Sequence, residues 1–168
     1  MLLAFALGVI LAIDPVHSHA NFSVEHIFVG HVTGTVPIVS GSIERPDDAR
    51  IPVRVVAVLD ARAIETGEPD RDNALRGPDW FETASYPTWR FTSSAIAPTA
   101  TGFTMEGALT IHGVTQPVHL DVAVSGDAAH PRYRASCTVD RHAFGMKRVP
   151  LDPTIGSTVD VTLDIATK

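Results

Sequence analysis

Eight histidines are spread through the 168 residues, and histidine is both a common metal ligand and the usual acid-base group near neutral pH. His17 and His19 lie two residues apart, a spacing that would place both imidazoles on one face of a strand. A zinc site needs three or four ligands with supporting carboxylates, and the sequence contains no HExxH, CxxC or nucleophile-elbow motif. We therefore expect no enzyme and no resident metal or cofactor, and a histidine-based site remains the alternative.

His26 and Cys137 are the two other side chains whose chemistry matters. His26 shares a strand face with Phe22 and Val24, so it is placed either to meet a ligand headgroup or to act as a hydrogen-bonded structural histidine. Cys137 is the single cysteine, which excludes an intramolecular disulfide. Its position on the apolar face of a strand favours a buried small hydrophobe over a nucleophile.

The composition limits the classes of partner. Thirteen Lys+Arg against 19 Asp+Glu give a formal net charge of -6, which argues against nucleic acid as a partner. A hydrophobic fraction of 45% with 19% charged residues is more apolar than a disordered chain. The length of 168 residues suits one domain with a sizeable core.

The first eleven residues, MLLAFALGVIL, form an apolar run that is too short for a membrane-spanning helix, which needs about 20 residues. Its length suits the hydrophobic region of a signal peptide. We expect residues 1–12 to be a signal peptide or a remnant of one, residues 13–168 to be one domain, and the protein to be periplasmic or secreted. An intrinsic first strand and an uncleaved anchor are the alternatives.

The clearest structural pattern is in residues 103–124, where apolar and polar side chains alternate in two arms. We place the reversal at residues 112–116, with Pro117 opening the second arm. Similar alternation predicts six more strands. These lie at residues 16–26, 32–43 with room for a bulge, 51–60 with Val53, Val55, Ala57 and Leu59 inward, 88–96, 133–140 and 158–167.

The alternation stops between residues 61 and 87, the one long excursion that we predict between strands. Short helical turns are expected at residues 72–76 and 79–84. Long connections of this kind are usually functional lids or disordered segments. Leu75, Trp80, Phe81 and Tyr86 favour a packed lid.

Eight mostly apolar-faced strands with short connections predict an all-β, antiparallel fold. An up-and-down barrel satisfies this pattern best because closure removes exposed strand edges, and a two-sheet sandwich is the alternative. The interior of an eight-stranded barrel is either filled by side chains or holds one small ligand.

The order of several short motifs also resembles a known family. The residues that carry the resemblance are Asp14, His17, Ser18, Phe22, Val24, His26, Gly34, Thr66, Gly67, Arg71, Asp72, Leu75, Arg76, Asp79, Phe81, Tyr86, Pro87, Phe91, Ser93, the segment 107–118 (GALTIHGVTQPV), Arg141, Phe144, Gly145 and Met146. In this order they resemble the bacterial YceI-like, polyisoprenoid-binding proteins. The resemblance implies a lipocalin-like barrel that encloses a long isoprenoid chain.

We therefore expect the barrel to carry or store a long-chain isoprenoid lipid, with a polyprenyl or quinone tail, in an apolar cavity. The composition alone would suit a fatty acid or another long-chain amphiphile equally well. The residues expected to contact the ligand are Phe22, Val24, His26, Val55, Leu75, Trp80, Phe81, Trp89, Phe91, Phe103, Met105, Leu109, Leu120, Tyr133, Phe144 and Met146. Each of these could instead be ordinary core.

The main alternative is a barrel plugged by its own side chains that serves as an interaction module for a membrane redox enzyme. Transient contact with a membrane or with a membrane redox protein is left open, as is a homodimer. The sequence does not separate carriage of the lipid from its storage.

Overall fold

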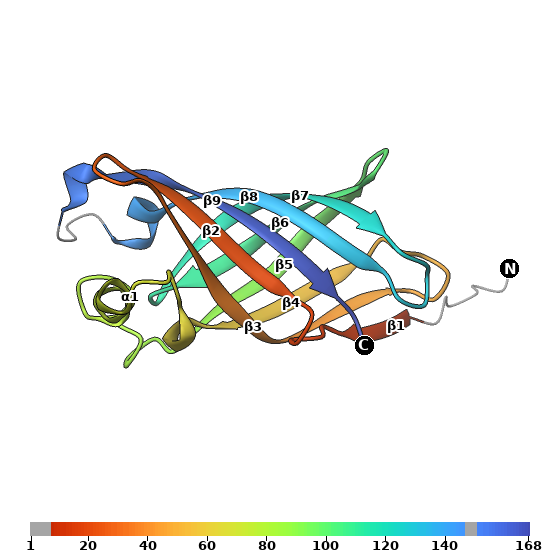
Figure 1. Ribbon diagram of the computed structural model, residues 1–168. Helices are drawn as coiled ribbons and strands as arrows, with labels where there is room; N and C mark the ends of the chain where they lie inside the picture. The colour runs from red at the N-terminus through yellow and green to blue at the C-terminus, as the bar shows by residue number, and fades with distance from the viewer. Residues whose placement is uncertain (1–7, 147–150) are drawn as a thin grey trace, which may run out of the picture.

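Alternating apolar and polar side chains organise most of the chain into strands, as the period of two requires. The computed structural model describes residues 8–146 and 151–168, and these contain nine strands in one antiparallel sheet (Figure 1). The strands are β1 Gly8–Ala12, β2 His19–His26, β3 Gly30–Pro46, β4 Arg54–Asp60, β5 Thr88–Pro98, β6 Gly102–Ile111, β7 Val114–Ser125, β8 Arg132–Asp140 and β9 Ile155–Ala166.

Eight of these strands close into a barrel, which confirms the predicted fold and excludes the sandwich. The order β3-β2-β9-β8-β7-β6-β5-β4 returns to β3 through the β3–β4 pairing. The long strand β3 makes this closure possible because it pairs with β2 from Gly30 to Pro37 and with β4 from Ile38 to Glu44. A register shift between Ile38 and Ser40 marks the bulge expected in this strand.

Strand β1 is the ninth strand and pairs with the end of β3, from Gly8↔Pro46 to Ala12↔Ser42. Residues 8–12 therefore belong to the sheet, as in the alternative of an intrinsic first strand. Whether residues 1–12 are removed in the cell stays a prediction.

The strand predicted at residues 16–26 begins only at His19, because residues 15–17 form a bend. The Asp14 carboxylate holds this bend by accepting the Val16 backbone N–H at 3.0 Å and by bonding His17 Nδ1 at 2.7 Å. The prediction that His17 and His19 share a strand face is therefore wrong.

Val53 is a second correction, because it lies before β4 and its side chain is 62% exposed. Its backbone N–H still bonds the Glu44 carbonyl at 2.8 Å. The strand predicted from apolar alternation began three residues too early, because β4 starts only at Arg54.

The β6–β7 turn is tighter than predicted. His112 and Gly113, with φ of 54° and 72°, form a two-residue turn between Ile111 and Val114. Pro117 therefore lies inside β7, opposite Ala108, and does not begin the strand. Proline is tolerated there because β8 pairs with β7 only from Asp121 to Ser125.

The predicted excursion at residues 61–87 lies at one end of the barrel, which we call the lid end, and the segment is called the lid (Figure 1). It contains a 3₁₀ turn at Ala61–Ala63 and one helix, α1 at Pro69–Arg76, whereas residues 79–84 form turns and not the expected helical turn. The β8–β9 connection, with 3₁₀ turns at Arg141–Phe144 and Asp152–Thr154, lies at the same end. No helix within the described ranges has the length and hydropathy to cross a membrane.

Candidate functional site

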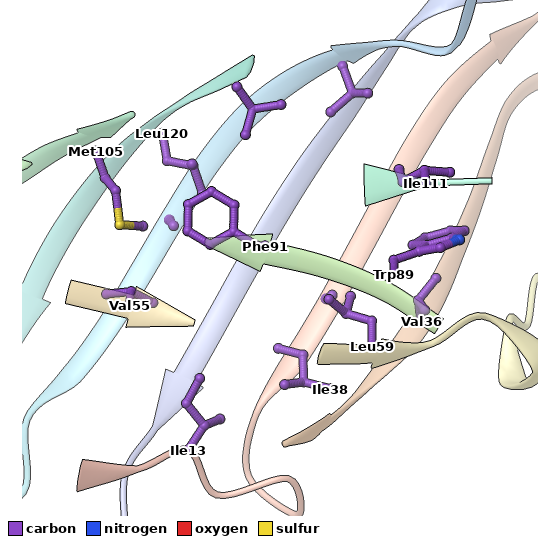
Figure 2. Close-up of a cluster of buried hydrophobic side chains, with 14 of the residues drawn as sticks. Ile13, Val36, Ile38, Val55, Leu59, Trp89, Phe91, Met105, Ile111 and Leu120 are labelled. Atoms are coloured by element: carbon purple, nitrogen blue, oxygen red, sulfur yellow. The ribbon is translucent and has the colours of Figure 1, made fainter. Parts of the chain in front are cut away.

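The inward-facing side chains of the barrel surround an apolar cavity of about 570 Å³. This volume lies within the range of roughly 300–1,000 Å³ that is typical of small-molecule sites. Figure 2 shows the wall from inside, with Trp89 and Ile111 toward one end of the cluster and Met105 and Val55 toward the other. The wall is built from every strand of the closed barrel, so the cavity runs through the interior of the sheet.

Glycines on neighbouring strands keep this interior open. A Cβ at Gly107 would lie 2.3 Å from the Phe91 ring, and a Cβ at Gly34 would lie 2.4 Å from the Phe22 ring. Both rings therefore lie against the wall, in the space that a side chain on the next strand would otherwise take. Two large aromatics thus line the barrel without plugging it.

The sixteen residues predicted to contact a ligand all line this cavity. They are Phe22, Val24, His26, Val55, Leu75, Trp80, Phe81, Trp89, Phe91, Phe103, Met105, Leu109, Leu120, Tyr133, Phe144 and Met146. Their contact with a ligand stays a prediction, because several are also fully packed core residues, such as Phe103 and Phe144.

The prediction missed other lining residues, among them Ile13, Val36, Ile38, Ile43, Leu59, Ile111, Val118, Val122, Val139, Val159, Val161, Leu163 and Ile165. Most are aliphatic residues on the inward face of a strand, so the alternation of apolar and polar residues could have identified them. The charged residues Arg71, Asp79 and Arg141 also reach the wall, and no apolar periodicity could have found them.

The lid closes one end of the cavity with aromatic side chains. The Phe81 ring packs against Trp89 of β5, with centroids 4.7 Å apart. The β6–β7 turn holds the other side of the lid, because the Tyr86 ring lies 5.0 Å from His112 and the Glu82 carboxylate lies 3.4 Å from His112 Nε2. The lid is therefore packed, as its aromatic content predicted.

Arg141 is the most prominent charged group at the lid end, and its side chain is 4% exposed. It donates to the carbonyls of Met146 at 2.7 Å and of Ile155 and Gly156 at 2.8 Å, and it forms an ion pair with Asp152 at 2.7 Å. Its guanidinium also lies 5.8 Å from the centroid of the Trp80 ring. These partners occupy the donors of Arg141, so it fixes the loop and does not offer a free charge to a ligand.

Asp152 completes this cluster between Arg141 and His142. The hydrogen bond from His142, at 3.0 Å, and the bond from Arg141 hold the pKa of the Asp152 carboxyl below its usual value. The carboxylate therefore stays ionised at neutral pH. The cluster is a structural ion pair with a histidine beside it, and it resembles no acid-base pair poised near neutral pH.

Cys137 lines the cavity, and burial raises the pKa of its thiol to about 11. The thiol is therefore protonated at neutral pH, which favours its interpretation as a small buried hydrophobe. His26 lies at the lid end of the wall, where its Nδ1 accepts the Phe28 backbone N–H at 3.3 Å. This bond gives His26 a structural task, and a contact with a headgroup stays a prediction.

The remaining histidines do not converge. His119 lies on the outer face as expected, where hydrogen bonding to Glu106 raises its pKa. In the described ranges, 8–146 and 151–168, no three His, Cys, Asp or Glu side chains come close enough to hold a metal ion. The cavity can thus exclude water and surround an apolar ligand, and it presents few polar groups to orient one.

Known proteins share this sequence pattern. The family model for the YceI-like domain matches residues 11–167. A UPF0312 protein of Photorhabdus laumondii is 29% identical over 121 residues, covering 71% of this chain and 63% of that protein. Protein YceI of Escherichia coli O17:K52:H18 is 28% identical over 115 residues, covering 68% and 60%. The match thus spans about three fifths of the length of these curated relatives.

Solved structures share the fold at lower identity. BcnA of Burkholderia cenocepacia superposes with a TM-score of 0.74 at 19% identity, covering 93% of this chain and 99% of that one. A polyisoprenoid binding domain from Saccharophagus degradans, implicated in plant cell wall breakdown, gives a TM-score of 0.71 at 19% identity, covering 94% and 97%. The family match over nearly the whole chain and the shared barrel lead to one conclusion: this chain belongs to the YceI-like family.

Proposed function

We propose that this protein binds a long-chain isoprenoid lipid non-covalently inside the barrel and carries or stores it without chemical turnover. The observation that carries this proposal is the apolar cavity of about 570 Å³ that remains inside a closed barrel. Membership of the YceI-like family supports it, as does the likeness to a domain named for polyisoprenoid binding.

The lining explains why a hydrocarbon tail suits this cavity. Transfer of about ten methylene equivalents from water gains on the order of 8 kcal/mol, before the entropy cost of association. Such a ligand asks for few directional bonds, and the lining is nearly all apolar. Among the lining side chains, the Trp89 indole N–H has no acceptor within the described part of the chain, and the Phe81 ring packs against Trp89.

The absence of turnover is part of the proposal and rests on how the polar groups near the cavity are engaged. Arg141 is paired with Asp152 and with backbone carbonyls, and Arg71 bonds the hydroxyl and carbonyl of Thr66. The Cys137 thiol, with its raised pKa, is a poor nucleophile at neutral pH. None of these groups is available to activate water or attack a ligand.

The proposal also places the protein in the periplasm or outside the cell, on the strength of the apolar run in residues 1–12. The intact mass of the protein recovered from an exporting host tests this point. Loss of residues 1–12 would show cleavage by a signal peptidase. A mass that still includes residues 8–12 would show that the mature protein keeps the residues of β1.

Native mass spectrometry of the purified protein, followed by organic extraction, tests the binding itself. We expect a stoichiometric prenyl lipid in the extract. Gly107→Ala should lower its occupancy, because the added Cβ meets the Phe91 ring at 2.3 Å and the Thr92 carbonyl at 2.7 Å. Gly156→Ala is the matched control, since its Cβ would make only ordinary contacts from 3.5 Å outward.

An empty wild-type protein that also fails to take up added quinone or polyprenol would overturn the proposal. That outcome would favour the plugged interaction module. Equal lipid content in the Gly107→Ala and Gly156→Ala variants would show that lipid binding does not depend on the space beside Phe91. That result would favour a binding site elsewhere on the protein.

A further inference from the structure

The β2–β3 turn carries three consecutive large apolar side chains that point into solvent. Ile27 is 72% exposed, Phe28 73% and Val29 62%. Single exposed apolar residues are normal on protein surfaces, but a contiguous group marks an interaction site. We call residues 27–29 the apolar tip.

The backbone of the apolar tip is ordered and its donors are used. The Ile27 N–H bonds the Thr154 carbonyl at 3.0 Å, the Phe28 N–H bonds His26 Nδ1 at 3.3 Å, and the Val29 N–H bonds the His26 carbonyl at 3.2 Å. A segment that enters a lipid interface must satisfy its backbone groups without water. All three donors of the tip meet this requirement.

The apolar tip lies at the lid end of the barrel (Figure 1). His26, which directly precedes the tip, lines the cavity, and so does Leu151 in the β8–β9 connection. Leu151 is itself 64% exposed, and the bond from Ile27 to Thr154 ties its loop to the tip. Leu151 therefore belongs both to the exposed apolar surface at the lid end and to the lining of the cavity.

The apolar tip lacks the charged residues that an electrostatic docking site needs. Residues 26–43 contain no Asp, Glu, Lys or Arg, and the chain has a formal net charge of -6. Attraction to anionic lipids requires clusters of basic residues. Docking through residues 27–29 themselves must therefore rest on apolar contact.

We propose that the apolar tip, together with Leu151, inserts into the surface of a lipid bilayer and sets the lid end of the cavity against the membrane. This inference rests on the proposed lipid-binding function. Docking on the membrane supplies the route by which an insoluble ligand enters and leaves the cavity. A second copy of the chain fits the patch less well. Four side chains offer a few hundred Å², whereas a stable dimer buries roughly 800 Å² per partner.

Flotation with vesicles of phosphatidylcholine that contain no isoprenoid tests this docking. The wild type should float, and the triple variant Ile27→Ser, Phe28→Ser, Val29→Ser should lose about 100-fold in partition, because three partly inserted side chains are removed. Added phosphatidylglycerol should not strengthen binding, and higher salt should not weaken it. The matched control is Val16→Ser with Val53→Ser, two exposed valines outside the lid end, at 71% and 62%, and it should float like the wild type.

Phe28→Trp gives a second readout that does not depend on a disruptive variant. Its added emission should shift to the blue on vesicle binding and be quenched by brominated lipids, whereas Val53→Trp should show neither effect. Thermal unfolding of each variant reports whether it folds.

A wild type that does not float, or a triple variant that floats equally well, would overturn the proposal. Loss of self-association with no effect on vesicles would also overturn it, in favour of an interface between copies. Lipid extraction from the same preparations distinguishes a failure of membrane docking from a failure of lipid binding in the cavity. A triple variant that retains its extracted lipid but no longer floats would fail only in docking, and a wild type that floats but never contains lipid would contradict only the cavity function.

Discussion

Two buried arginines stand at opposite ends of the barrel, and their partners differ. Arg45, at the end away from the lid, is 3% exposed and donates to the carbonyls of Pro46, Asp47 and Ala49 in its own connection. It also donates to the Ala128 carbonyl in the β7–β8 connection. One side chain thus joins two loops, and the Tyr133 hydroxyl adds a bond of 2.8 Å to the Arg50 carbonyl nearby.

Arg141 at the lid end satisfies its donors within the β8–β9 connection and at the first two residues of β9. It meets the lid through the Trp80 ring, at 5.8 Å. Hydrogen bonds from charged groups contribute about 1.5–3 kcal/mol each, and a partly exposed cation–π contact contributes about 0.5–1 kcal/mol. The same residue type therefore joins two connections at one end of the barrel, whereas at the lid end it joins its own loop to the lid only through the Trp80 ring.

The largest expected effect is at the fixed end. Arg45→Met should lower the free energy of unfolding by roughly 3–5 kcal/mol, because it leaves several buried carbonyls without donors. Urea denaturation of the lipid-free protein measures this loss. Arg50→Met is the matched control, because Arg50 lies in the same loop, is exposed and donates only to the Gly126 carbonyl among the described residues. It should cost no more than about 0.5 kcal/mol.

A loss below about 1 kcal/mol for Arg45→Met would contradict the comparison, because the far end would then not depend on its arginine. The lipid content per folded molecule should stay unchanged in this variant, since Arg45 does not line the cavity.

The second effect concerns the lid. Trp80→Ala with Phe81→Ala should speed lipid release by about tenfold or more while lowering stability by only about 1–2 kcal/mol, since both side chains are partly exposed. Transfer of bound lipid to acceptor vesicles measures release, and thermal unfolding measures stability. Phe103→Ala, in the buried wall near Tyr133, should lower the free energy of unfolding by roughly 3–5 kcal/mol and change the rate of lipid release less than the double variant does. Equal losses of retention and stability in the double variant would mean that the two aromatics are core.

The parts of the fold that the sequence predicted depend on local periodicity. Alternating side chains and short connections were enough to define the barrel, and the loss of alternation after Asp60 located the lid. The large apolar residues line the cavity because every second residue of a strand faces the inside of the barrel. Phe91 and Met105, which belong to neighbouring strands, are examples.

The parts that escaped prediction depend on long-range partners. A bulge was expected in β3, but its position near Val39 was not, and it changes the parity of the strand so that Ile38 and Ile43 both point inward although they are an odd number of residues apart. Arg45 is buried because a distant loop brings the Ala128 carbonyl to it, and Arg141 is buried because the chain that follows it folds back over its guanidinium; no local pattern shows either. An apolar run such as residues 1–12 has the same composition whether it is a signal peptide or a strand.

The smallest expected effect is a difference in acid sensitivity between the two ends. Bonds from His142 and Arg141 lower the pKa of Asp152, so its ion pair contributes fully above the ordinary carboxyl pKa of about 3.9. The contribution is lost as the pH falls through the lowered value. The carbonyl partners of Arg45 do not titrate in this range, so acid should weaken the contacts of Arg141 and leave those of Arg45 intact.

Lipid release measured from neutral pH down through this acidic window tests that expectation. Release from the wild type should accelerate only below about pH 4, and by a small factor because the Asp152 side chain is 24% exposed and partly hydrated. Asp152→Asn should release lipid faster already at neutral pH and lose the acid response, because its side chain cannot ionise. Asp47→Asn, in the loop at the far end, should keep the wild-type profile. An Asp152→Asn variant with an unchanged acid response would show that another group controls the lid end, and the contrast between the two arginines would then rest on Trp80 alone.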